Sequence, residues 1–226
     1  MNGINFKTFI PVTDDCVRIK NPYLYYLPDD LHLTMVDEDV APHSPLFSLI
    51  KRSKIYTQYW VWKNCDLEYY GFAQCDRFLY LKKKNEISGV REDIRIPKIN
   101  EDSILDLGYH SSNVNQFLEN ETIFIGAPTY IDIKNASNIY QLYKLNNELD
   151  IKCLDCTIQI LHDLYPGYSV DLKEYLSGAQ CYSNNLFIMC NSVFKRYCDW
   201  LFHILEEVST RLRSTGDVNK LMYNAD

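Results

Sequence analysis

A run of aromatic residues in the first third of the chain leads directly into a short apolar segment, predicted as a strand over residues 69–75. Gly71 inside this strand marks either a bulge or a close approach of another group to the backbone. The strand ends in the polar residues Gln74, Asp76 and Arg77. Loops after the carboxyl ends of buried strands hold binding and catalytic groups on a rigid scaffold. The sequence therefore predicts a site at the end of this strand.

Strands and helices alternate along the rest of the chain. Apolar and polar residues alternate over 4–12, as in a strand, while apolar residues recur at helical spacing over 46–63 and 193–212. The other predicted elements are strands at 31–36, 122–128 and 185–189, helices at 138–145 and 153–164, and short elements of unspecified type at 103–107 and 114–118. Loops are predicted elsewhere in 21–45 and in a long excursion over 81–120. This order indicates an α/β layer architecture, formed by one domain over residues 1–213, with a frayed tail over 214–226.

Composition excludes several classes of protein. Hydrophobic residues make up 46% of the 226 residues and charged residues 23%, as in ordinary globular proteins. The net charge of -7 argues against general binding of nucleic acid, which needs a basic footprint. Lys82-Lys83-Lys84 is the one compact basic run. It is interpreted as a solvated loop, with contact to phosphate or to an anionic membrane surface as the alternative.

The amino-terminal sequence lacks the pattern of a secretory signal, and no apolar run is long enough to span a membrane. We therefore expect a cytoplasmic protein whose eight cysteines are mostly reduced thiols. Cys153 and Cys156 form a CxxC motif, but no second pair accompanies it at zinc spacing. Because the motif lies on a helical pattern, we expect it to pack in the core.

Three segments in a fixed order, between residues 46 and 212, carry a resemblance to one family. They are Tyr59-Trp60-Val61-Trp62-Lys63-Asn64 with Tyr70-Gly71-Phe72 after it, Tyr165-Pro166-Gly167-Tyr168, and Asn185-Leu186-Phe187-Ile188-Met189 with the helix that follows. Together they resemble a family of small bacterial and viral glycosyltransferase domains associated with capsular polysaccharide and lipopolysaccharide assembly, long catalogued as a domain of unknown function.

The resemblance implies a single-domain, Rossmann-like α/β fold of the GT-A-like kind, with a mixed central sheet flanked by helices. It also implies transfer of a hexose, above all galactose, from a uridine diphosphate sugar to a glycan or lipid-linked acceptor in polysaccharide or glycoconjugate assembly. The expected partners are this donor and acceptor and, peripherally, the inner face of a membrane. No nucleic acid is expected.

Transfer from such a donor requires stabilisation of a diphosphate leaving group, by a divalent cation or by positively charged side chains. Gln74 and Asp76 would point to the same face if the strand continued through them. Asp76 is then the candidate catalytic residue and ligand of Mn²⁺ or Mg²⁺, with Gln74 on the ribose or the metal. Arg77 is the candidate phosphate ligand. The alternative is a polar strand end capped by local hydrogen bonds.

Three further residues complete the expected donor site: Thr8 in the first strand, Trp60 in the aromatic helix and Asn185 before a later strand. Trp60 could equally pack in the core, and Asn185 could close a turn. An inverting transferase also needs a general base for the acceptor hydroxyl. Asp155 is the candidate, although nothing in the sequence separates it from its neighbours Asp163 and His162.

A second hypothesis is a non-catalytic carbohydrate-binding or partner module on the same scaffold. Many relatives have glutamate at the position of Lys54, and many have histidine at the positions of Gln74 and of Asn146. These departures from the pattern motivate a module that has kept the scaffold and lost the site. Because the phosphate-binding patterns GxxxxGK[ST] and GxGxxG do not occur, nucleotide-dependent enzymes of other kinds are disfavoured.

Overall fold

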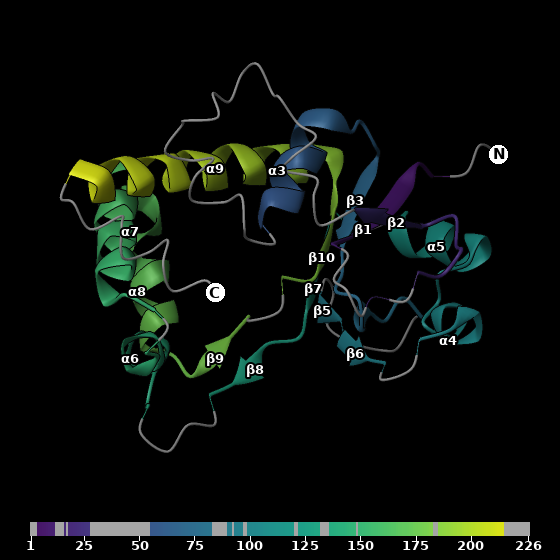
Figure 1. Cartoon of the computed structure of the whole chain (residues 1–226), viewed down its shortest axis with the longest axis horizontal. Coiled ribbons are helices and arrows are strands. Elements are labelled where there is room, and N and C mark those ends of the chain that lie inside the picture. The colour runs from purple at the N-terminus through teal and green to yellow at the C-terminus, as the bar shows by residue number, and fades with distance from the viewer. Residues whose placement is uncertain are drawn as a thin grey trace. The chain divides into compact units, whose positions relative to one another are not determined.

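A computed structural model describes residues 4–11, 16, 18–27, 55–82, 90–91, 93–96, 99–119, 122–131, 136–147, 149–182 and 185–214 (Figure 1). The chain forms two compact units, and each has its own core. Unit 1 comprises Met1–Met35, Lys54–Ala127 and Asn184–Cys198, and unit 2 comprises Val36–Ser53, Pro128–Ser183 and Asp199–Asp226. The prediction of a single domain over 1–213 stays a prediction, and residues 215–226 of the predicted tail lie outside the described residues.

A six-stranded mixed sheet forms the centre of unit 1. Its strands, in spatial order, are β2 (Leu24–Leu27), β1 (Phe6–Pro11), β3 (Tyr69–Phe72), β10 (Phe187–Cys190), β7 (Ile123–Gly126) and β5 (Val90–Arg91). β1 runs parallel to β2 and β3, β10 runs antiparallel to β3 and β7, and β5 runs parallel to β7. The predicted α/β class with a mixed central sheet is therefore confirmed.

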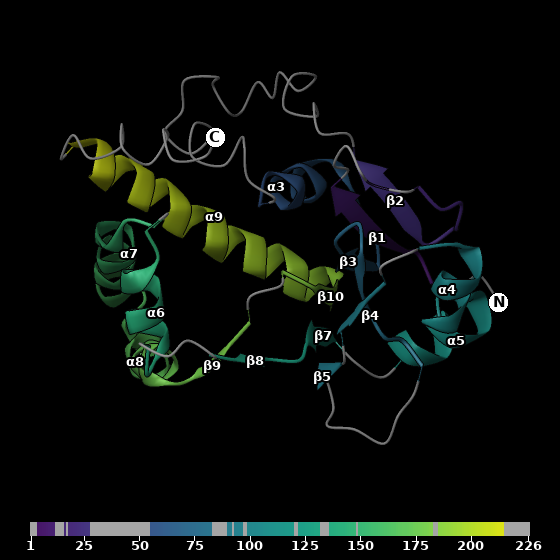
Figure 2. The same cartoon turned by 60° about the horizontal axis from the view of Figure 1, so that its bottom comes forward.

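Helices flank this sheet on both faces. They are α3 (Ile55–Asn64), α4 (Glu101–Asp106), α5 (Ser111–Leu118) and the beginning of α9 (Asn191–Ser214). On one face the ring of Tyr70 stacks on that of Phe194 in α9, with centroids 4.3 Å apart. On the other face Phe124 stacks on Phe117 of α5, with centroids 4.2 Å apart. Within unit 1, α4 and α5 lie on one side of the sheet and α3 on the other (Figure 2). Both faces are thus buried, as in doubly wound sheets.

Gly71 lies where β3 is most closely packed. It pairs in regular register with Thr8 of β1 and with Ile188 of β10, so the strand has no bulge there. A β-carbon on Gly71 would lie 2.7 Å from Thr8 Oγ1 and 3.3 Å from Ile188 Cγ1. Of the two readings of this glycine, close approach is confirmed.

Polar side chains fix the starts of three helices. The side chain of Asn100 accepts a hydrogen bond from the Ser103 backbone N–H before α4, and Asn138 does the same for α6 (Ile139–Leu145). Asp150 accepts from the Lys152 N–H at the start of α7 (Ile151–Leu164). Such caps satisfy backbone donors that the first turn of a helix leaves free.

Unit 2 is mainly helical within its described residues. It contains α6, α7, the short 3-10 helix η1 (Pro166–Tyr168), α8 (Ser169–Ser177), the later part of α9 and a ribbon of β8 (Thr129–Tyr130) with β9 (Gln180–Cys181). Ile160 and Leu161 of α7 pack with Ile204, Val208 and Leu212 of α9 in its core. Cys153 and Cys156 are partly buried against this cluster, which confirms the interpretation of the CxxC motif as packing.

Most of the predicted elements are present with shifted ends. The strand predicted over 69–75 ends at Phe72, and the strand over 185–189 is β10 at Phe187–Cys190. The predicted loop at 21–45 contains β2. The long excursion over 81–120 contains β6 (Asp93–Arg95), which forms a ribbon with β4 (Arg77–Leu79). α8 was not predicted. The predicted strand at 31–36 and residues 46–54 of a predicted helix lie outside the described residues.

Two further findings concern the expected cellular setting. None of the helices within the described ranges is both long and apolar enough to span a membrane. Cys16 and Cys75 form a disulfide, and the other six cysteines are free thiols. The expectation of mostly reduced cysteines therefore holds for six of the eight.

Candidate functional site

The carboxyl edge of the unit 1 sheet gathers several of the predicted site residues. This edge is formed by the residues that follow β1, β3 and β7 and by those that precede the antiparallel strand β10. Ala73 N–H donates to the Phe9 carbonyl at 3.1 Å, and Gly126 N–H donates to the Leu186 carbonyl at 3.1 Å. Gln74 and Asn185, which are distant in sequence, thus come to the same edge. Ligands of open α/β sheets bind outside the carboxyl ends of the strands.

Gln74 and Arg77 close a two-residue hairpin turn at this edge. The Gln74 N–H donates to the Arg77 carbonyl at 3.0 Å, and the Arg77 N–H donates to the Gln74 carbonyl at 3.3 Å. Cys75 and Asp76 form the turn between them. The expectation that Gln74 and Asp76 share a strand face is therefore wrong, because the strand ends before them and the chain reverses direction.

Asp76 is half-exposed and forms an ion pair with Arg95 of β6. Arg95 Nε donates to Asp76 Oδ2 at 2.7 Å, and 42% of the aspartate side chain remains exposed. The Ile96 N–H donates to the Asp76 carbonyl at 2.7 Å. The ribbon of β4 and β6 thus fixes both the backbone and the carboxylate of this residue. Asp76 lies neither in a sealed interior nor detached from other charged groups.

A disulfide restrains the same turn. Cys75 is bonded to Cys16, and their Cα atoms are 5.3 Å apart. Cys16 follows β1, so the link joins the segments after two neighbouring parallel strands. A crosslink of this kind limits the conformations that the turn can adopt.

The other predicted donor residues lie at different depths. Asn185 is exposed at the carboxyl edge, two residues before β10. Arg77 begins β4 and is partly buried. Thr8 is 1% exposed inside the sheet, so it offers no surface to a ligand in this conformation. Trp60 is half-buried on α3, and its carbonyl accepts a hydrogen bond from Asn64 Nδ2 at 2.8 Å.

The structure places Asp155 in unit 2, on an exposed part of α7. Its carboxylate accepts a hydrogen bond from the Tyr140 hydroxyl at 2.9 Å. This bond favours the protonated phenol and raises the pKa of Tyr140. Its neighbour Asp163 pairs with Arg211 at 2.9 Å, which lowers the pKa of Asp163. Within the described structure, Asp163 thus pairs with an arginine, and Asp155 with a tyrosine hydroxyl.

A divalent cation at this edge would need more oxygen ligands than Asp76 supplies. Among the residues that the structure describes, no three His, Cys, Asp or Glu side chains lie together as a metal site. Asp76 supplies one carboxylate, with the Gln74 amide at the other end of the same turn. Mg²⁺ is commonly bound by one or two carboxylates together with substrate phosphates and water. Asp76 alone fits a cation only where a bound ligand supplies the remaining oxygens.

Two residues of unit 1 were not singled out from the sequence. Arg95 is one of them, because its ion pair with Asp76 depends on the pairing of β4 with β6, which the sequence did not predict. Gln58 on α3 is the other. It is 1% exposed, and within the part of the chain that the structure describes neither Oε1 nor Nε2 has a hydrogen-bond partner. The helical pattern around Gln58 gives no sign of this burial.

Comparisons with known proteins give one family and one solved structure. A model of the family "Domain of unknown function (DUF4422)" matches residues 53–221. No curated protein matches the chain. The solved apo structure of the bifunctional glycosyltransferase WbbM has a TM-score of 0.73 and 22% sequence identity over 98% of this chain. The chain spans 42% of the length of that protein. At this identity the likeness shows a shared fold.

Proposed function

This chain belongs to the DUF4422 family of domains of unknown function, and from its fold and the residues at its carboxyl edge we propose that it is a nucleotide-sugar-dependent glycosyltransferase. The proposed reaction moves a hexose, galactose above all, from a uridine diphosphate sugar to a glycan or lipid-linked acceptor in polysaccharide or glycoconjugate assembly. The proposed setting is the cytoplasm, with peripheral contact to the inner face of a membrane.

One observation carries the proposal: two arginines face each other beside Asp76. Arg77 of β4 pairs in register with Arg95 of β6. Side chains directly opposite each other on neighbouring strands lie on the same face, and like charges in such positions repel. Arg95 binds Asp76 through Nε, and 69% of its side chain is exposed, so its terminal nitrogens can donate to an anion such as a diphosphate.

The chemistry requires that this charge act on the leaving group. As the bond between the sugar and the diphosphate breaks, negative charge develops on the diphosphate, and fixed positive groups lower the energy of that state. Guanidinium groups suit this task, because their planar donors match phosphate oxygens in pairs. Asp76 would hold Arg95 in position or hold Mn²⁺ or Mg²⁺, which would supply further positive charge. Gln74 and Asn185 are proposed to bind ribose or sugar hydroxyls.

Asp155 stays the proposed general base for the acceptor hydroxyl. Its carboxylate is exposed and already accepts one hydrogen bond, from Tyr140. If it removes the acceptor proton, Asp155→Asn should lower kcat while leaving donor hydrolysis by water measurable. An unchanged kcat would remove Asp155 from the reaction.

A panel of nucleotide sugars tests the proposed function. Each donor is added to the full chain with and without Mn²⁺, and thermal stability and slow donor hydrolysis are measured. We expect one uridine diphosphate hexose to raise the melting temperature and to be hydrolysed, because a ligand that binds only the folded state stabilises it. If no donor in the panel is bound or turned over, the enzyme proposal fails.

The same panel separates the second candidate, a non-catalytic carbohydrate-binding module. The departures at Lys54, Gln74 and Asn146 favour it. Such a module would bind free glycans in a glycan array without stabilisation by any nucleotide sugar. A transferase would instead require the nucleotide part of the donor for binding.

A further inference from the structure

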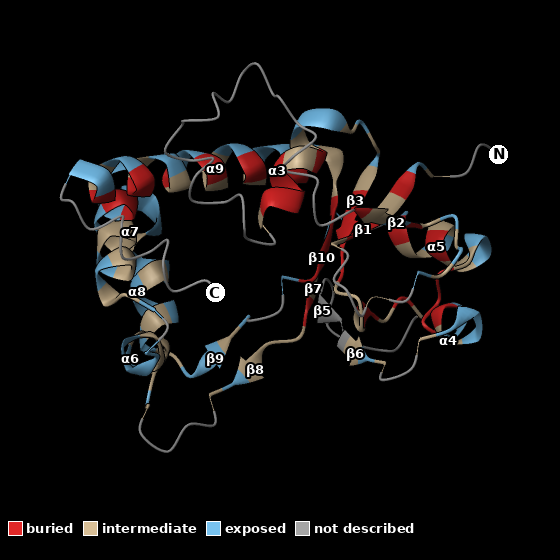
Figure 3. Ribbon diagram, in the orientation of Figure 1, coloured by how far each residue is buried: buried red, intermediate tan, exposed pale blue. Residues whose placement is uncertain are grey.

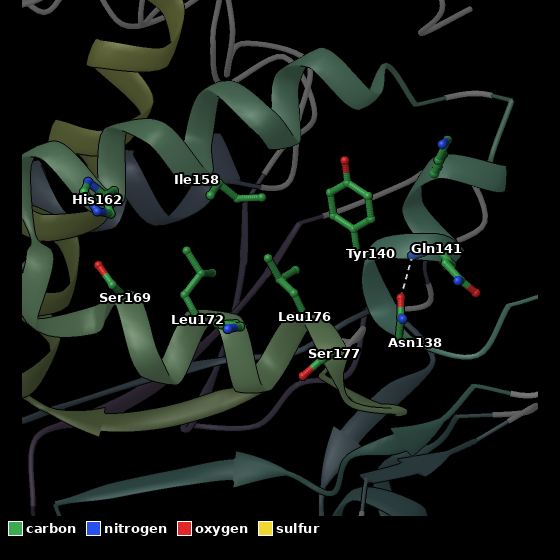
Figure 4. Close-up of a pocket in the computed structure, with 11 residues that line it drawn as sticks. Asn138, Tyr140, Gln141, Ile158, His162, Ser169, Leu172, Leu176 and Ser177 are labelled. Carbon is green, nitrogen blue, oxygen red and sulfur yellow. Dashed lines mark hydrogen bonds between the residues drawn. The ribbon is translucent and has the colours of Figure 1, made fainter.

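Unit 2 contains a groove between α6, α7 and α8 with a volume of about 570 Å³ (Figure 4). This volume falls within the range of small-molecule sites, roughly 300–1,000 Å³. The lining residues are Asn138, Tyr140, Gln141, Lys144, Ile158, His162, Ser169, Leu172, Lys173, Leu176 and Ser177. All of them belong to unit 2.

The groove has an apolar middle and polar ends. Ile158 of α7 faces Leu172 and Leu176 of α8 across it, and the Tyr140 ring lies beside them (Figure 4). His162 and Ser169 lie together at one end, whereas Asn138, Gln141 and Ser177 lie at the other (Figure 4). A ligand that fills the groove must therefore combine an apolar part with a polar terminus.

The charges that line the groove have one sign. Lys144 and Lys173 are exposed lining residues. No carboxylate is found among the described residues that line the groove, although Asp155 accepts a hydrogen bond from the hydroxyl of Tyr140. In a chain of net charge -7, this local excess of positive groups favours an anionic ligand.

The groove is also incompletely packed. Neither α6 nor α8 contains a buried residue, although both place apolar side chains against it (Figure 3). The Ser169 hydroxyl is buried at the His162 end and has no hydrogen-bond partner among the described residues. A buried hydroxyl without a partner costs free energy, which an acceptor atom of a ligand would offset.

We propose that this groove binds a single-chain amphiphile with an anionic headgroup of the alkyl phosphate class. The alkyl chain lies along Tyr140, Ile158, Leu172 and Leu176. The phosphate lies at the His162 end, where it accepts a hydrogen bond from Ser169. Lys173 lies one helical turn after Ser169 on α8 and adds a positive charge within reach of the same end.

Two sources supply this chemistry: the lipid of a lipid-linked acceptor, and a membrane phospholipid of which one acyl chain and the phosphate would enter the groove. Assigning the ligand to the acceptor rests on the proposed function, whereas the binding itself does not. Binding is therefore measured without any nucleotide sugar, so that failure of transfer and failure of the groove are separate results.

Calorimetric titration of the full chain compares three probes below their micelle concentrations: dodecyl phosphate, the uncharged dodecyl maltoside and inorganic phosphate. We expect dodecyl phosphate to bind at least ~10-fold more tightly than either other probe, because only it offers both the chain and the charge. Equal affinity for the two amphiphiles, or for inorganic phosphate, would overturn the proposal.

Matched variants on α8 locate the site. Leu176→Glu places a carboxylate in the apolar wall and should weaken dodecyl phosphate binding by about 10-fold or more. Val170→Glu makes the same change at a side chain that is 65% exposed and does not line the groove, and it should bind as the wild type does. Ser169→Ala should weaken dodecyl phosphate binding by about 10-fold or more, a loss that follows from one hydrogen bond to a charged group. Wild-type affinity in Leu176→Glu, with circular dichroism unchanged, would contradict the assignment.

Sedimentation with phosphatidylglycerol vesicles distinguishes the sources. If the ligand is a membrane lipid, the wild type should sediment with the vesicles and Leu176→Glu should not. If the ligand is the acceptor's lipid, neither protein should sediment, and the calorimetric difference should remain. Sedimentation of both proteins, together with equal dodecyl phosphate affinities, would overturn the proposal.

Discussion

Gly71 and Thr8 face each other across the β1–β3 pair so closely that a β-carbon on Gly71 would lie 2.7 Å from Thr8 Oγ1. Phe6 and Ile188 close the same space at 3.1 Å and 3.3 Å. The glycine therefore lets three side chains pack against the β3 backbone, directly before the turn that carries Asp76. This packing fixes β3 against its neighbouring strands, next to the turn that contains Asp76.

Gly71→Ala should lower the free energy of unfolding by about 1–3 kcal/mol, because the added methyl group overpacks a filled core. Urea unfolding measures this change. Adding Thr8→Ala removes the closest contact and should recover part of the loss, beyond what the two single variants predict by addition. Gly167→Ala is the matched control, since its β-carbon would meet nothing within 4 Å. Equal effects at the two glycines would contradict the packing account.

Gln58→Leu should raise the free energy of unfolding, by about 1–2 kcal/mol, because it removes two buried polar atoms that lack partners among the described residues. Thermal and urea unfolding measure the gain. Gln141→Leu, at an exposed residue whose amide oxygen accepts from Ser137, is the control and should give no gain. A loss of stability in Gln58→Leu would instead mean that the amide binds a group such as a water molecule.

Burial of Tyr197 should make the free energy of unfolding depend on pH in the alkaline range. Burial raises the pKa of Tyr197 from 10.0 to about 12. Because the folded state holds this proton more tightly than the unfolded chain, the stabilisation is complete below pH 10 and is lost as the pH rises toward 12. The free energy of unfolding should fall over this window, and the fall should be smaller in Tyr197→Phe. Identical slopes for the two proteins would contradict the burial of the hydroxyl.

The elements predicted well from sequence are those with a strong apolar period. α7 and α9 pack apolar residues that recur along one face. β1 was predicted from its alternation of apolar and polar residues, and in the structure four of its six residues are buried. α8 has no buried residue, so its sequence carries no such period. β2 has four residues inside a segment rich in turn formers, which conceals it. Burial of a face does not account for every prediction, because α6 was predicted although it has no buried residue.

The candidate site was predicted less completely, because its geometry depends on contacts distant in sequence. The polar character of Gln74, Asp76 and Arg77 was evident in the sequence, but their turn requires the ribbon with β6. Arg95 lies 19 residues from Asp76 and pairs with it only through that ribbon. No periodicity within a short window contains this information. The roles predicted for these residues remain to be measured.

The most direct measurement of the central claim compares hexose transfer by Asp76→Asn and Asp66→Asn with the wild type. Both aspartates lie in unit 1 and form exposed ion pairs, Asp76 with Arg95 and Asp66 with Lys195 at 3.2 Å. Asp66 precedes β3, at the opposite edge of the sheet. We predict that Asp76→Asn lowers kcat/KM by about 100-fold or more, as loss of an electrostatic group in a catalytic site does, while Asp66→Asn keeps wild-type transfer. Wild-type transfer by a folded Asp76→Asn protein would contradict the account.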